Sequence, residues 1–468
     1  MSLLGSWIPT IYLVHQTARE FLLRPGDVDF DQNGQLANTG SWEHSLFVGN
    51  TNQALPEICT WYLSLSDFKD QPLVVDPSTG DAFLKERVDE YTRGYTLLLY
   101  AARFWPEHLR LSKVSQKDPH LDWYLELYDT GSKRFRTWWQ IYWVAVYEYS
   151  LGPEKITPLI LAAYFGQTEM AKKILSASMS GINRLKTLFW RKEHDPINAS
   201  DDDEKSALSW AAKHGHLDTV RCLFDQWKID VNWRDSMHMT PLILAAKHGH
   251  IEVVKLLLLR KDINADPGDD RWRSALSWAA DGYPAIARIF LDRNDVNINS
   301  EDRYDCTPLY YAAKSGSLEI VQLLLARPNL EINFNDANAS PLAAAILSGV
   351  VEISKLFLER AKLSTTGFNL EGALLDAAEN GNIQAVQMVL GLDRSLVGCR
   401  SVSGRTPLAL AAQWGHTEVV RFLLKETDLD INCVDDGQWT PLISAISWLC
   451  SRTWSHCYSP ISVEEARY

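Results

Sequence analysis

Apolar and polar residues alternate along the last two-thirds of the chain with the period of an α-helix. After Gly249, the apolar residues Ile251, Val254, Leu257 and Leu258 fall on one face at helical spacing. A shorter apolar run that ends in two alanines precedes this segment. The pattern therefore predicts two helices that are joined by a turn at the glycine.

The opening segment recurs nine times at a nearly constant interval, which predicts eight pairs of helices and a ninth first helix. Each copy opens with a segment of the type Thr-Pro-Leu-x-x-Ala-Ala, and successive openings are 49, 34, 34, 33, 33, 32, 34 and 34 residues apart. The long first interval predicts an insertion within residues 179–205 that includes the acidic run Asp201 to Glu204. The nine openings, which number the repeats from one to nine, stand at Thr157, Ser206, Thr240, Ser274, Thr307, Ser340, Gly372, Thr406 and Thr440.

Each copy carries residues that begin and end short helices. The Thr or Ser of the opening supplies an N-cap oxygen, and Pro is tolerated next because the first helical position needs no hydrogen-bond donor. A glycine further on allows the left-handed backbone that ends a helix. Asp-rich turns such as Asp230-Val-Asn then lead into a short finger before the next copy. These glycines are Gly215, Gly249, Gly316, Gly349, Gly381 and Gly415.

The unit resembles the ankyrin repeat, a 33-residue module with the signature T-P-L-x-x-A-A-x-x-G-H. The resemblance covers about residues 155–449. It implies an all-α protein with an irregular N-terminal helical domain, followed by an ankyrin-repeat solenoid of about nine repeats. It also implies protein binding through a concave surface of finger tips and first helices. The positions that match in repeat three are Leu242, Ala245, Ala246, Gly249 and His250.

Several repeats depart from this signature. Repeat four has Tyr283-Pro284 in place of Gly-His, which predicts that its turn shifts to Gly282. Repeat seven replaces Thr-Pro with Gly372-Ala373. Repeat nine breaks off after its first helix, so we expect either a poorly covered edge or a truncated product. The signature leaves open how three finger tips turn, because they carry His238, Trp272 and Asp305 where the family favours Gly.

The first 150 residues lack the repeat and hold eight of the 18 tryptophans. Their apolar patterns predict helices at 53–65, 95–111 and 135–147, and we interpret the aromatic residues as core. Also expected are an apolar run at 11–15, a short helix at 16–23, and loops at 24–42 and 70–81. The predicted domains are a helical region (1–150), the repeats (151–450, with the insertion) and an irregular tail (451–468).

Three N-terminal segments resemble the region that follows the nucleotide-binding domain in fungal NACHT proteins, which are multidomain STAND signalling proteins. These segments are Leu13–Leu23, Leu55–Leu65 and Leu97–Arg110. In that family the region connects the NTPase to a C-terminal ankyrin array. The phosphate-binding motif G-x-x-x-x-G-K-[ST] does not occur in this sequence. The resemblance therefore implies the regulatory half of a nucleotide-switch protein without its own NTPase domain.

Composition and charge narrow the function further. The formal net charge of −13 argues against a general nucleic-acid binder, which needs a basic face. No apolar run is long enough to predict a transmembrane helix, and the segment Met1 to Val14 lacks the basic region of a signal peptide. The seven cysteines form no C-x-x-C pair, which favours a reducing, intracellular and cytoplasmic location.

Candidate chemistry is sparse. The trio Cys450, His456 and Cys457 lacks the second close pair of a metal site, and the pairs His214/His216 and His248/His250 recur because the repeat recurs. We interpret Cys59 as a buried apolar residue. No cofactor is expected. A competing enzyme hypothesis would need His15 or His108 close to a carboxylate or a thiol; the histidines of that region are His15, His44, His108 and His120.

The first hypothesis is a non-enzymatic, protein-binding scaffold or ligand-sensing module that takes no small-molecule substrate. Arg, Tyr, Met and Trp, which interfaces enrich, are common at its finger tips and first-helix ends. The acidic segments Asp201–Glu204 and Asp269–Asp270 are interpreted as solvated face or loop. The predicted contact residues are Ser236, Met237, Met239, Lys247, His248, Arg271, Arg273, Arg303, Tyr304, Lys314, Gln413 and Trp414.

Overall fold

A computed structural model describes residues 51–65, 67–70, 72–73, 81–95, 97–112, 114–147, 152–180, 197–226, 228–332, 340–363, 370–425 and 429–454. Within these ranges the chain is helical, and the extended pairings are two isolated bridges. The prediction of an all-α repeat fold is confirmed. The predicted elements at 11–15, 16–23 and 24–42, the histidines His15 and His44, and the tail after residue 454 lie outside the described residues.

The contacts of the chain divide it into two compact units. The first comprises Met1–Ala211 and His216–Asp230, and the second comprises Ala212–Gly215 and Val231–Tyr468. The division therefore falls inside helix α11 (Ala207–Lys213). The domain boundaries expected at residues 150 and 450 stay predictions.

The predicted N-terminal helices are confirmed with small shifts at their ends. Helix α5 packs against α2 and α7, while α4 occupies a segment for which no helix was predicted. The helices of the first unit are α2 (Thr51–Leu63), α3 (Asp67–Asp70), α4 (Asp81–Arg93), α5 (Leu98–Leu111), α6 (Leu121–Tyr124), η2 (Leu125–Tyr128), α7 (Lys133–Tyr147), α8 (Pro158–Tyr164), α9 (Thr168–Ser180), most of α11, and α12 (Leu217–Phe224).

Large aromatic side chains form the core of the first unit. Trp105 of α5 and Trp138 of α7 are buried and meet edge to face, with ring centroids 5.2 Å apart. Trp139 of α7 meets Tyr164, which ends the first helix of repeat one, in the same geometry at 5.9 Å. The carbonyl of Pro106 accepts a hydrogen bond from the buried Gln167 side chain at 2.9 Å. Repeat one is therefore packed directly onto the aromatic core, as the interpretation of these residues requires.

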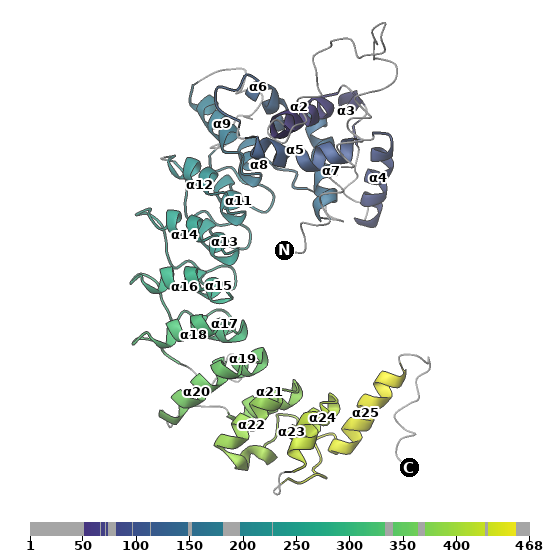
Figure 1. Ribbon diagram of the computed structural model, residues 1–468, viewed down its shortest axis with the longest axis vertical. Coiled ribbons are helices and arrows are strands. Elements are labelled where there is room, and N and C mark those ends of the chain that lie inside the picture. Colours follow the sequence, from purple (N-terminus) through teal and green to yellow (C-terminus); the bar gives the residue numbers. More distant parts are fainter. Residues whose placement is uncertain are drawn as a thin grey trace, which may run out of the picture. The chain divides into compact units, whose positions relative to one another are not determined.

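In the second unit, two layers of short helices run side by side (Figure 1). Each first helix contacts the first helix of the next repeat, and each second helix contacts the next second helix. The first helices are α13 (Pro241–Lys247), α15 (Ala275–Ala280), α17 (Pro308–Lys314), α19 (Pro341–Ser348), α21 (Leu370–Glu379), α23 (Pro407–Gln413) and α25 (Pro441–Trp454). The second helices are α14 (Ile251–Leu257), α16 (Pro284–Leu291), α18 (Leu318–Leu325), α20 (Val351–Leu363), α22 (Ile383–Leu392), with the 3-10 turn η3 (Arg394–Gly398) after it, and α24 (Thr417–Leu423).

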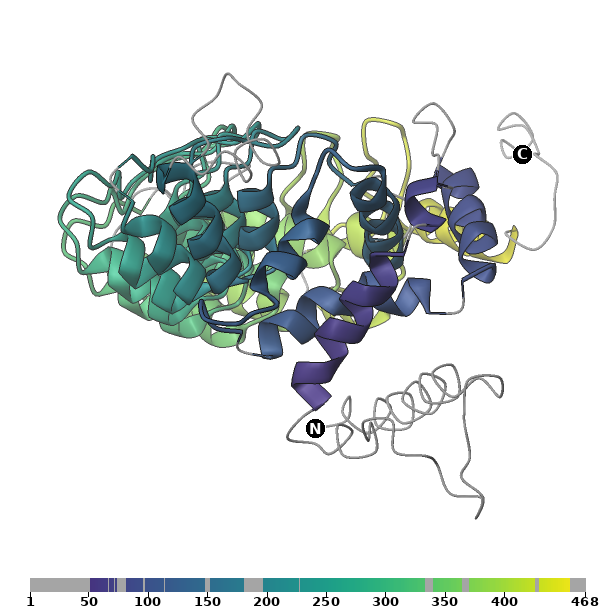
Figure 2. The same ribbon diagram turned by 90° about the horizontal axis from the view of Figure 1, so that it is seen from above.

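A continuous apolar spine joins these layers. Leu242 of α13, its counterpart Leu276 of α15, and Leu257 of α14 are fully buried. Burying one leucine contributes about 1.5–3 kcal/mol, and every repeat supplies several such residues, so each repeat is stabilised mainly by its neighbours. Figure 2 shows the connecting loops of the teal repeats gathered along one side of their helices.

The capping residues act as the sequence predicts. Thr240 accepts a hydrogen bond from the backbone N–H of Ile243 at 3.3 Å, and the openings of the other repeats that begin with Ser or Thr do the same. The six predicted glycines all have left-handed backbone, with φ between +71° and +78°. In repeat four the turn does shift to Gly282, at φ +130°, and Tyr283 takes the place of the histidine. In repeat seven the helix begins earlier and continues through Gly372.

The last described helix leaves an apolar edge exposed. On α25, Leu442, Ile443 and Ile446 are 69%, 44% and 50% exposed, whereas Leu242 and Ile243 at the equivalent positions of α13 are fully buried. In the other repeats the next first helix covers this face. The expected poorly covered edge is thus present among the described residues.

Candidate protein-interaction surface

A buried aspartate closes the base of each finger in repeats three to five. Oδ1 of Asp235 accepts the backbone N–H groups of Met237 and Met239 at 3.0 and 2.8 Å. Asp269 and Asp302 hold the next two fingers with the same pair of hydrogen bonds. A side chain of the finger itself therefore fixes the conformation of each finger.

The finger tips adopt left-handed backbone even though they are not glycine. The φ angles are +56° at His238, +63° at Trp272 and +59° at Asp305. For a residue with a Cβ atom this region costs about 1–2 kcal/mol. The paired hydrogen bonds to the basal aspartate offset that cost, so the same turn forms without the usual glycine.

Adjacent fingers are also joined to each other. The backbone N–H of Asp270 donates to the carbonyl of Met237 at 2.9 Å, and that of Arg303 donates to the carbonyl of Arg271 at 2.8 Å. These bonds hold three successive fingers in register. Side chains at equivalent tip positions are therefore presented at regular intervals on a stiff frame.

Most of the predicted contact residues are accessible on this frame. Met237 and Tyr304 are 44% and 58% exposed, and Lys247 is half-buried. Ser236, His248, Arg271, Arg303 and Lys314 are also exposed. We call this set the central strip. It consists of Ser236, Met237, Lys247, His248, Arg271, Arg303, Tyr304 and Lys314.

Two of the predicted contact residues are buried, so the prediction that they are exposed is wrong. Met239 and Arg273 are only 4% and 9% exposed. Both stand directly before an N-cap, where the backbone pairs with the basal aspartate: Asp235 N donates to Met239 O, and Asp269 N donates to Arg273 O. This pairing turns their side chains toward the first helices and away from the finger tips.

Arg273 instead organises an aromatic stack beneath the central strip. Its guanidinium lies 3.7 Å from the ring centroid of Trp278 and 3.6 Å from that of Tyr311. Nη2 donates to the carbonyl of Ser277 and to Asp281, at 3.1 and 3.0 Å. Such stacking is stronger for a desolvated cation, about 2 kcal/mol or more. The stack therefore stiffens repeats four and five under the exposed residues.

Lys247 completes the stack from repeat three. Its Nζ lies 4.1 Å from the ring centroid of Trp278. Burial lowers the pKa of Lys247; nearby Asp269 opposes this shift, and Arg273 adds to it. Burial also lowers the pKa of the neighbouring His248, helped by Lys213 and Lys247. Lys247 is thus surrounded by both acidic and basic side chains, whereas the charges that act on His248 are basic.

The acidic segments Asp201–Glu204 and Asp269–Asp270 lie in loops, as interpreted, but the first residue of each segment is buried. Asp201 and Asp269 are buried finger bases, and each accepts the indole N–H of the tryptophan nine residues later, at 2.7 and 3.0 Å. Asp201 therefore lies at the regular repeat position, so the inserted residues precede the acidic run and do not include it.

Sequence reasoning missed Trp278 and Tyr311, although a signal for them exists. Trp278 and Tyr311 each stand nine residues after a finger aspartate and donate to its second oxygen. In repeat three that position is Leu244, which cannot donate, and no described residue donates to the buried Oδ2 of Asp235. An Asp-x8-Trp/Tyr spacing within the repeats would have identified the stack.

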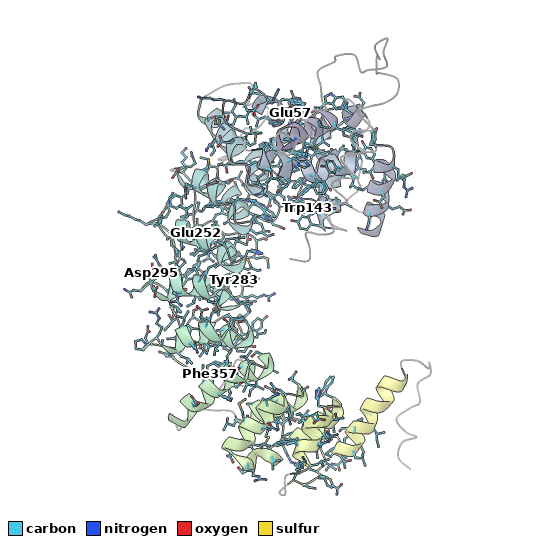
Figure 3. The ribbon with its side chains drawn as sticks, viewed as in Figure 1. Glu57, Trp143, Glu252, Tyr283, Asp295 and Phe357 are labelled. Atoms are coloured by element: carbon cyan, nitrogen blue, oxygen red, sulfur yellow. The ribbon has the colours of Figure 1, made fainter. Side chains whose placement is uncertain are left out.

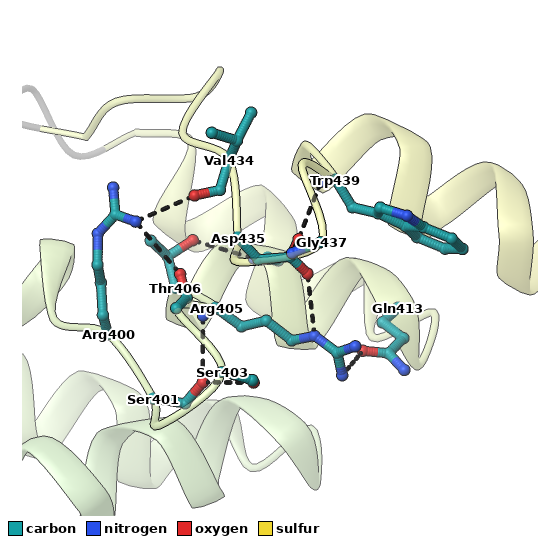
Figure 4. A network of polar contacts seen from close by, with 12 residues as sticks. Arg400, Ser401, Ser403, Arg405, Thr406, Gln413, Val434, Asp435, Gly437 and Trp439 are labelled. Atoms are coloured by element: carbon teal, nitrogen blue, oxygen red, sulfur yellow. Dashed lines mark hydrogen bonds and ion pairs between the residues drawn. The ribbon is translucent and has the colours of Figure 1, made fainter. Parts of the chain in front are cut away.

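The last predicted contact residues, Gln413 and Trp414, belong to repeat eight, and Figure 4 shows Gln413 beside Arg405. Gln413 is engaged internally, because its Oε1 accepts from Arg405 Nη1 at 2.9 Å. The same guanidinium donates from Nε to Asp435, the basal aspartate of the next finger, at 3.2 Å. Trp414 is 50% exposed and stays available. Of this pair, only the tryptophan offers a free side chain.

The histidine pairs have a structural role, as the repeat implies. Nε2 of His250 lies 2.9 Å from the carbonyl of Lys213, and its ring covers Gly215 so closely that a Cβ atom there would overlap it. His416 makes the same contact with Glu379 O at 2.8 Å. Across the described ranges, no group of three or more His, Cys, Asp or Glu side chains is arranged to hold a metal ion.

Two of the four histidines named for the enzyme hypothesis, His108 and His120, lie in the described residues. Nε2 of His108 lies 2.9 Å from the hydroxyl of Tyr100. Nδ1 of His120 lies 3.3 Å from Glu57, but both side chains are about half exposed. Cys59 is buried, and burial raises the pKa of its thiol to about 12, so it is a neutral thiol.

None of the described helices is long and apolar enough to cross a membrane.

Comparisons with known proteins agree with the repeat geometry. A family model described as ankyrin repeats (3 copies) matches residues 174–269, 263–336 and 374–453, which together exceed half of the chain. The ankyrin repeat domain-containing protein SAT10 of Stachybotrys chartarum is 26% identical over 300 residues, or 62% of this chain and 14% of that protein.

Two other relatives match shorter parts. The ankyrin repeat protein nuc-2 of Neurospora crassa is 29% identical over 155 residues, covering 32% of this chain and 14% of that protein. The probable 26S proteasome regulatory subunit p28 of Saccharomyces cerevisiae is 27% identical over 187 residues, covering 38% of this chain and 78% of that protein. The chain thus spans about one-seventh of the length of the two filamentous-fungal relatives.

Proposed function

The chain belongs to the ankyrin-repeat family, and from this premise we propose that it binds another protein through the central strip and catalyses no reaction. Ankyrin repeats are protein-interaction modules, so binding is the function to be located. The proposal assigns that function to repeats three to five. It makes the chain a scaffold or sensing module that presents a rigid surface.

One observation carries this proposal: exposed Met237, Arg271, Arg303 and Tyr304 stand on fingers that are locked in register by backbone hydrogen bonds. A preformed frame reduces the entropy that is lost on binding. Tyr, Arg and Met are also the residue types that interfaces enrich. An exposed, regularly spaced set of these side chains is therefore well suited to grip a partner.

The test uses the full chain as bait in affinity capture from its own cell extract. In the test variant, Met237, Arg271, Arg303 and Tyr304 are all replaced by Ala. In a matched control, four exposed residues on or beside the second helices are replaced instead: Lys255, Leu259, Arg288 and Glu319.

The proposal predicts that the test variant loses one specific partner and that the control variant keeps it. Helical circular dichroism is expected to be unchanged in both, because neither set contributes to the buried spine. Equal capture by wild type and test variant, or loss of the partner from the control alone, would direct the search to another face.

A second candidate is the regulatory half of a NACHT-type switch protein. It is supported by the resemblance of three N-terminal segments, two of which coincide with the contacting helices α2 and α5. Mapping the 5′ end of the transcript tests it. An in-frame upstream extension that encodes G-x-x-x-x-G-K-[ST] supports this candidate, and a transcript without one contradicts it. An intracellular, cytoplasmic location stays a prediction from cysteine usage.

A further inference from the structure

Asparagine side chains connect the loops of successive repeats. Nδ2 of Asn232 donates to the carbonyl of Asp262 at 2.7 Å, and its Oδ1 accepts the backbone N–H of Asn264 at 2.8 Å. Asn198 makes the same pair of bonds one repeat earlier, and Asn299 makes it two repeats later. Each amide thus satisfies a donor and an acceptor of the next loop, because it offers both kinds of group.

The loop after repeat three (258–268) carries an aspartate at this position. Like the three asparagines, Asp266 stands three residues before the basal aspartate of a finger. Its Oδ2 accepts the backbone N–H of Asn297, in the loop after repeat four (292–300), at 3.1 Å. Its Oδ1 is buried and has no hydrogen-bond partner among the described residues. The acceptor half of the link is therefore present, and the donor half is missing.

The missing donor has a defined target in the next loop. At the other three positions, the amide nitrogen donates to the carbonyl two residues before the bonded N–H. The equivalent carbonyl here is that of Asp295. An ionised carboxylate offers acceptors only, so Asp266 cannot make this bond while it is charged. A protonated carboxyl can make it, because it carries one O–H donor and keeps an acceptor.

The surroundings of Asp266 favour its neutral form. Burial raises the pKa of this carboxyl; its hydrogen bond from the backbone opposes the shift, and the negative charge of Asp295 adds to it. Asp295, labelled in Figure 3, lies in the next loop and pairs with Arg293 at 2.6 Å. In the loop of Asp266 itself, Arg260 pairs with Asp262 at 2.7 Å. The two arginines of these loops are therefore engaged with other carboxylates.

We propose that the link between the loops after repeats three and four is a pH-sensitive joint, in which a proton on Oδ1 of Asp266 donates to the carbonyl of Asp295. The protonated side chain then makes both bonds that an asparagine makes at the other links. Acidification therefore tightens the attachment of repeat four. These loops lead into the fingers that carry Arg271 and Arg303, so the joint stiffens the frame of the central strip, whatever that strip binds.

The direction of the pH dependence follows from linkage. The pKa of Asp266 in the folded chain lies above its ordinary value of 3.8, so the folded state holds this proton more tightly than the unfolded state. The stability that the proton contributes is fully present below that ordinary value, and it is lost as the pH rises through the folded-state pKa. Carboxylates such as Asp262, whose pKa is lowered by its arginine partner, act in the opposite direction. Matched variants are therefore needed to isolate Asp266.

The experiment exchanges the side chains of two equivalent loop positions in the full chain. Asp266→Asn supplies the missing amide, and Asn232→Asp creates the same defect one repeat earlier. Hydrogen exchange of each protein is read by mass spectrometry at pH 7, 5.5 and 4 and corrected for the intrinsic exchange rate. The helices that the two links hold, residues 275–291 and 241–257 respectively, report the local opening constants.

One hydrogen bond sets the size of the expected effect. At pH 7, Asp266→Asn is expected to lower the opening constant of residues 275–291 about fivefold. Asn232→Asp is expected to raise that of residues 241–257 by about the same factor. Both ratios to the wild type are expected to move toward one as the pH falls, because the carboxyl becomes protonated. Titration of the other carboxylates affects variant and wild type alike and leaves each ratio unchanged.

Three results would overturn the proposal. Equal opening of Asp266→Asn and wild type at pH 7 would show that Oδ1 needs no donor. A difference that persists unchanged from pH 7 to pH 4 would show that protonation does not restore the bond. Wild-type opening of residues 241–257 in Asn232→Asp at pH 7 would show that the amide link does not hold the repeat.

Discussion

Asp235 and Asp269 hold the same position in neighbouring repeats and differ by one hydrogen bond, so the same substitution is expected to have different effects. In both, Oδ1 accepts two backbone N–H groups of the finger. Oδ2 of Asp269 also accepts the indole N–H of Trp278 at 3.0 Å, whereas no described residue donates to Oδ2 of Asp235. The perturbation is Asp→Asn at each site.

The magnitudes follow from counting donors. Three N–H donors surround Asp269, and an asparagine can turn its single oxygen toward the backbone or toward Trp278 but not both. The side-chain NH2 group of the asparagine then faces the remaining N–H donor. That donor loses a hydrogen bond to a charged group, which is worth about 1.5–3 kcal/mol. At Asp235 the asparagine oxygen satisfies both backbone donors. Only attraction to the half-buried Lys247 is lost, at about 0–1 kcal/mol.

Native-state hydrogen exchange of the full chain, read by mass spectrometry, measures both local stabilities. Asp269→Asn is expected to lower the opening free energy of residues 270–280 by about 1.5–3 kcal/mol. Asp235→Asn is expected to change that of residues 236–246 by less than about 1 kcal/mol. Equal losses at the two sites, or a larger loss at Asp235, would refute the assignment of the Trp278 bond as the difference.

Three further predictions concern single residues. Gly249→Ala is expected to lower the thermal midpoint of unfolding more than Gly349→Ala. Both glycines have left-handed backbone, which costs an alanine about 1–2 kcal/mol. Only the Cβ atom at position 249 would also meet a side chain, 2.3 Å from the Tyr283 ring. Equal shifts would contradict this. Trp272→Gly is expected to slow exchange of its finger, since glycine removes up to about 1 kcal/mol of backbone strain; faster exchange would show that the indole stabilises the tip. Burial raises the pKa of Cys59 from 9.0 to about 12. As the pH rises, the thiol therefore ionises first in the unfolded chain. The contribution of the buried neutral thiol to stability is present below pH 9 and is lost as the pH rises from 9 toward 12. Iodoacetamide at pH 8.5 should accordingly leave Cys59 unmodified in native protein by mass spectrometry, and rapid alkylation would contradict its burial.

The repeat fold is largely readable from the sequence because its determinants are local and periodic. The N-cap at Thr240, the left-handed Gly249 and the apolar stripe after it each follow from neighbouring residues. Even the irregular repeat four was predictable, since the missing glycine at its expected position is replaced one residue earlier by Gly282. Helix α4 was missed because its sequence is largely polar, although Leu84, Val88 and Tyr91 stand at the i, i+4, i+7 spacing of a helix face.

The candidate surface was less readable, because exposure depends on register across a finger. Met239 and Arg273 stand only two residues from exposed tip residues, yet pairing with the basal aspartate turns them inward. The stack of Arg273 with Trp278 and Tyr311 joins repeats four and five. A pattern within one repeat does not contain such a contact, although the recurring Asp-x8-Trp/Tyr spacing points to part of it.

The proposed function requires that the finger face of repeats three to five, and not their second helices, meets the partner. Hydrogen exchange of the full chain with and without the captured partner decides this directly. We expect slower exchange in residues 236–240, 270–274 and 303–307 on binding, with helices α14, α16 and α18 unchanged. Protection confined to those second helices, with the finger residues exchanging as in the free chain, would contradict it.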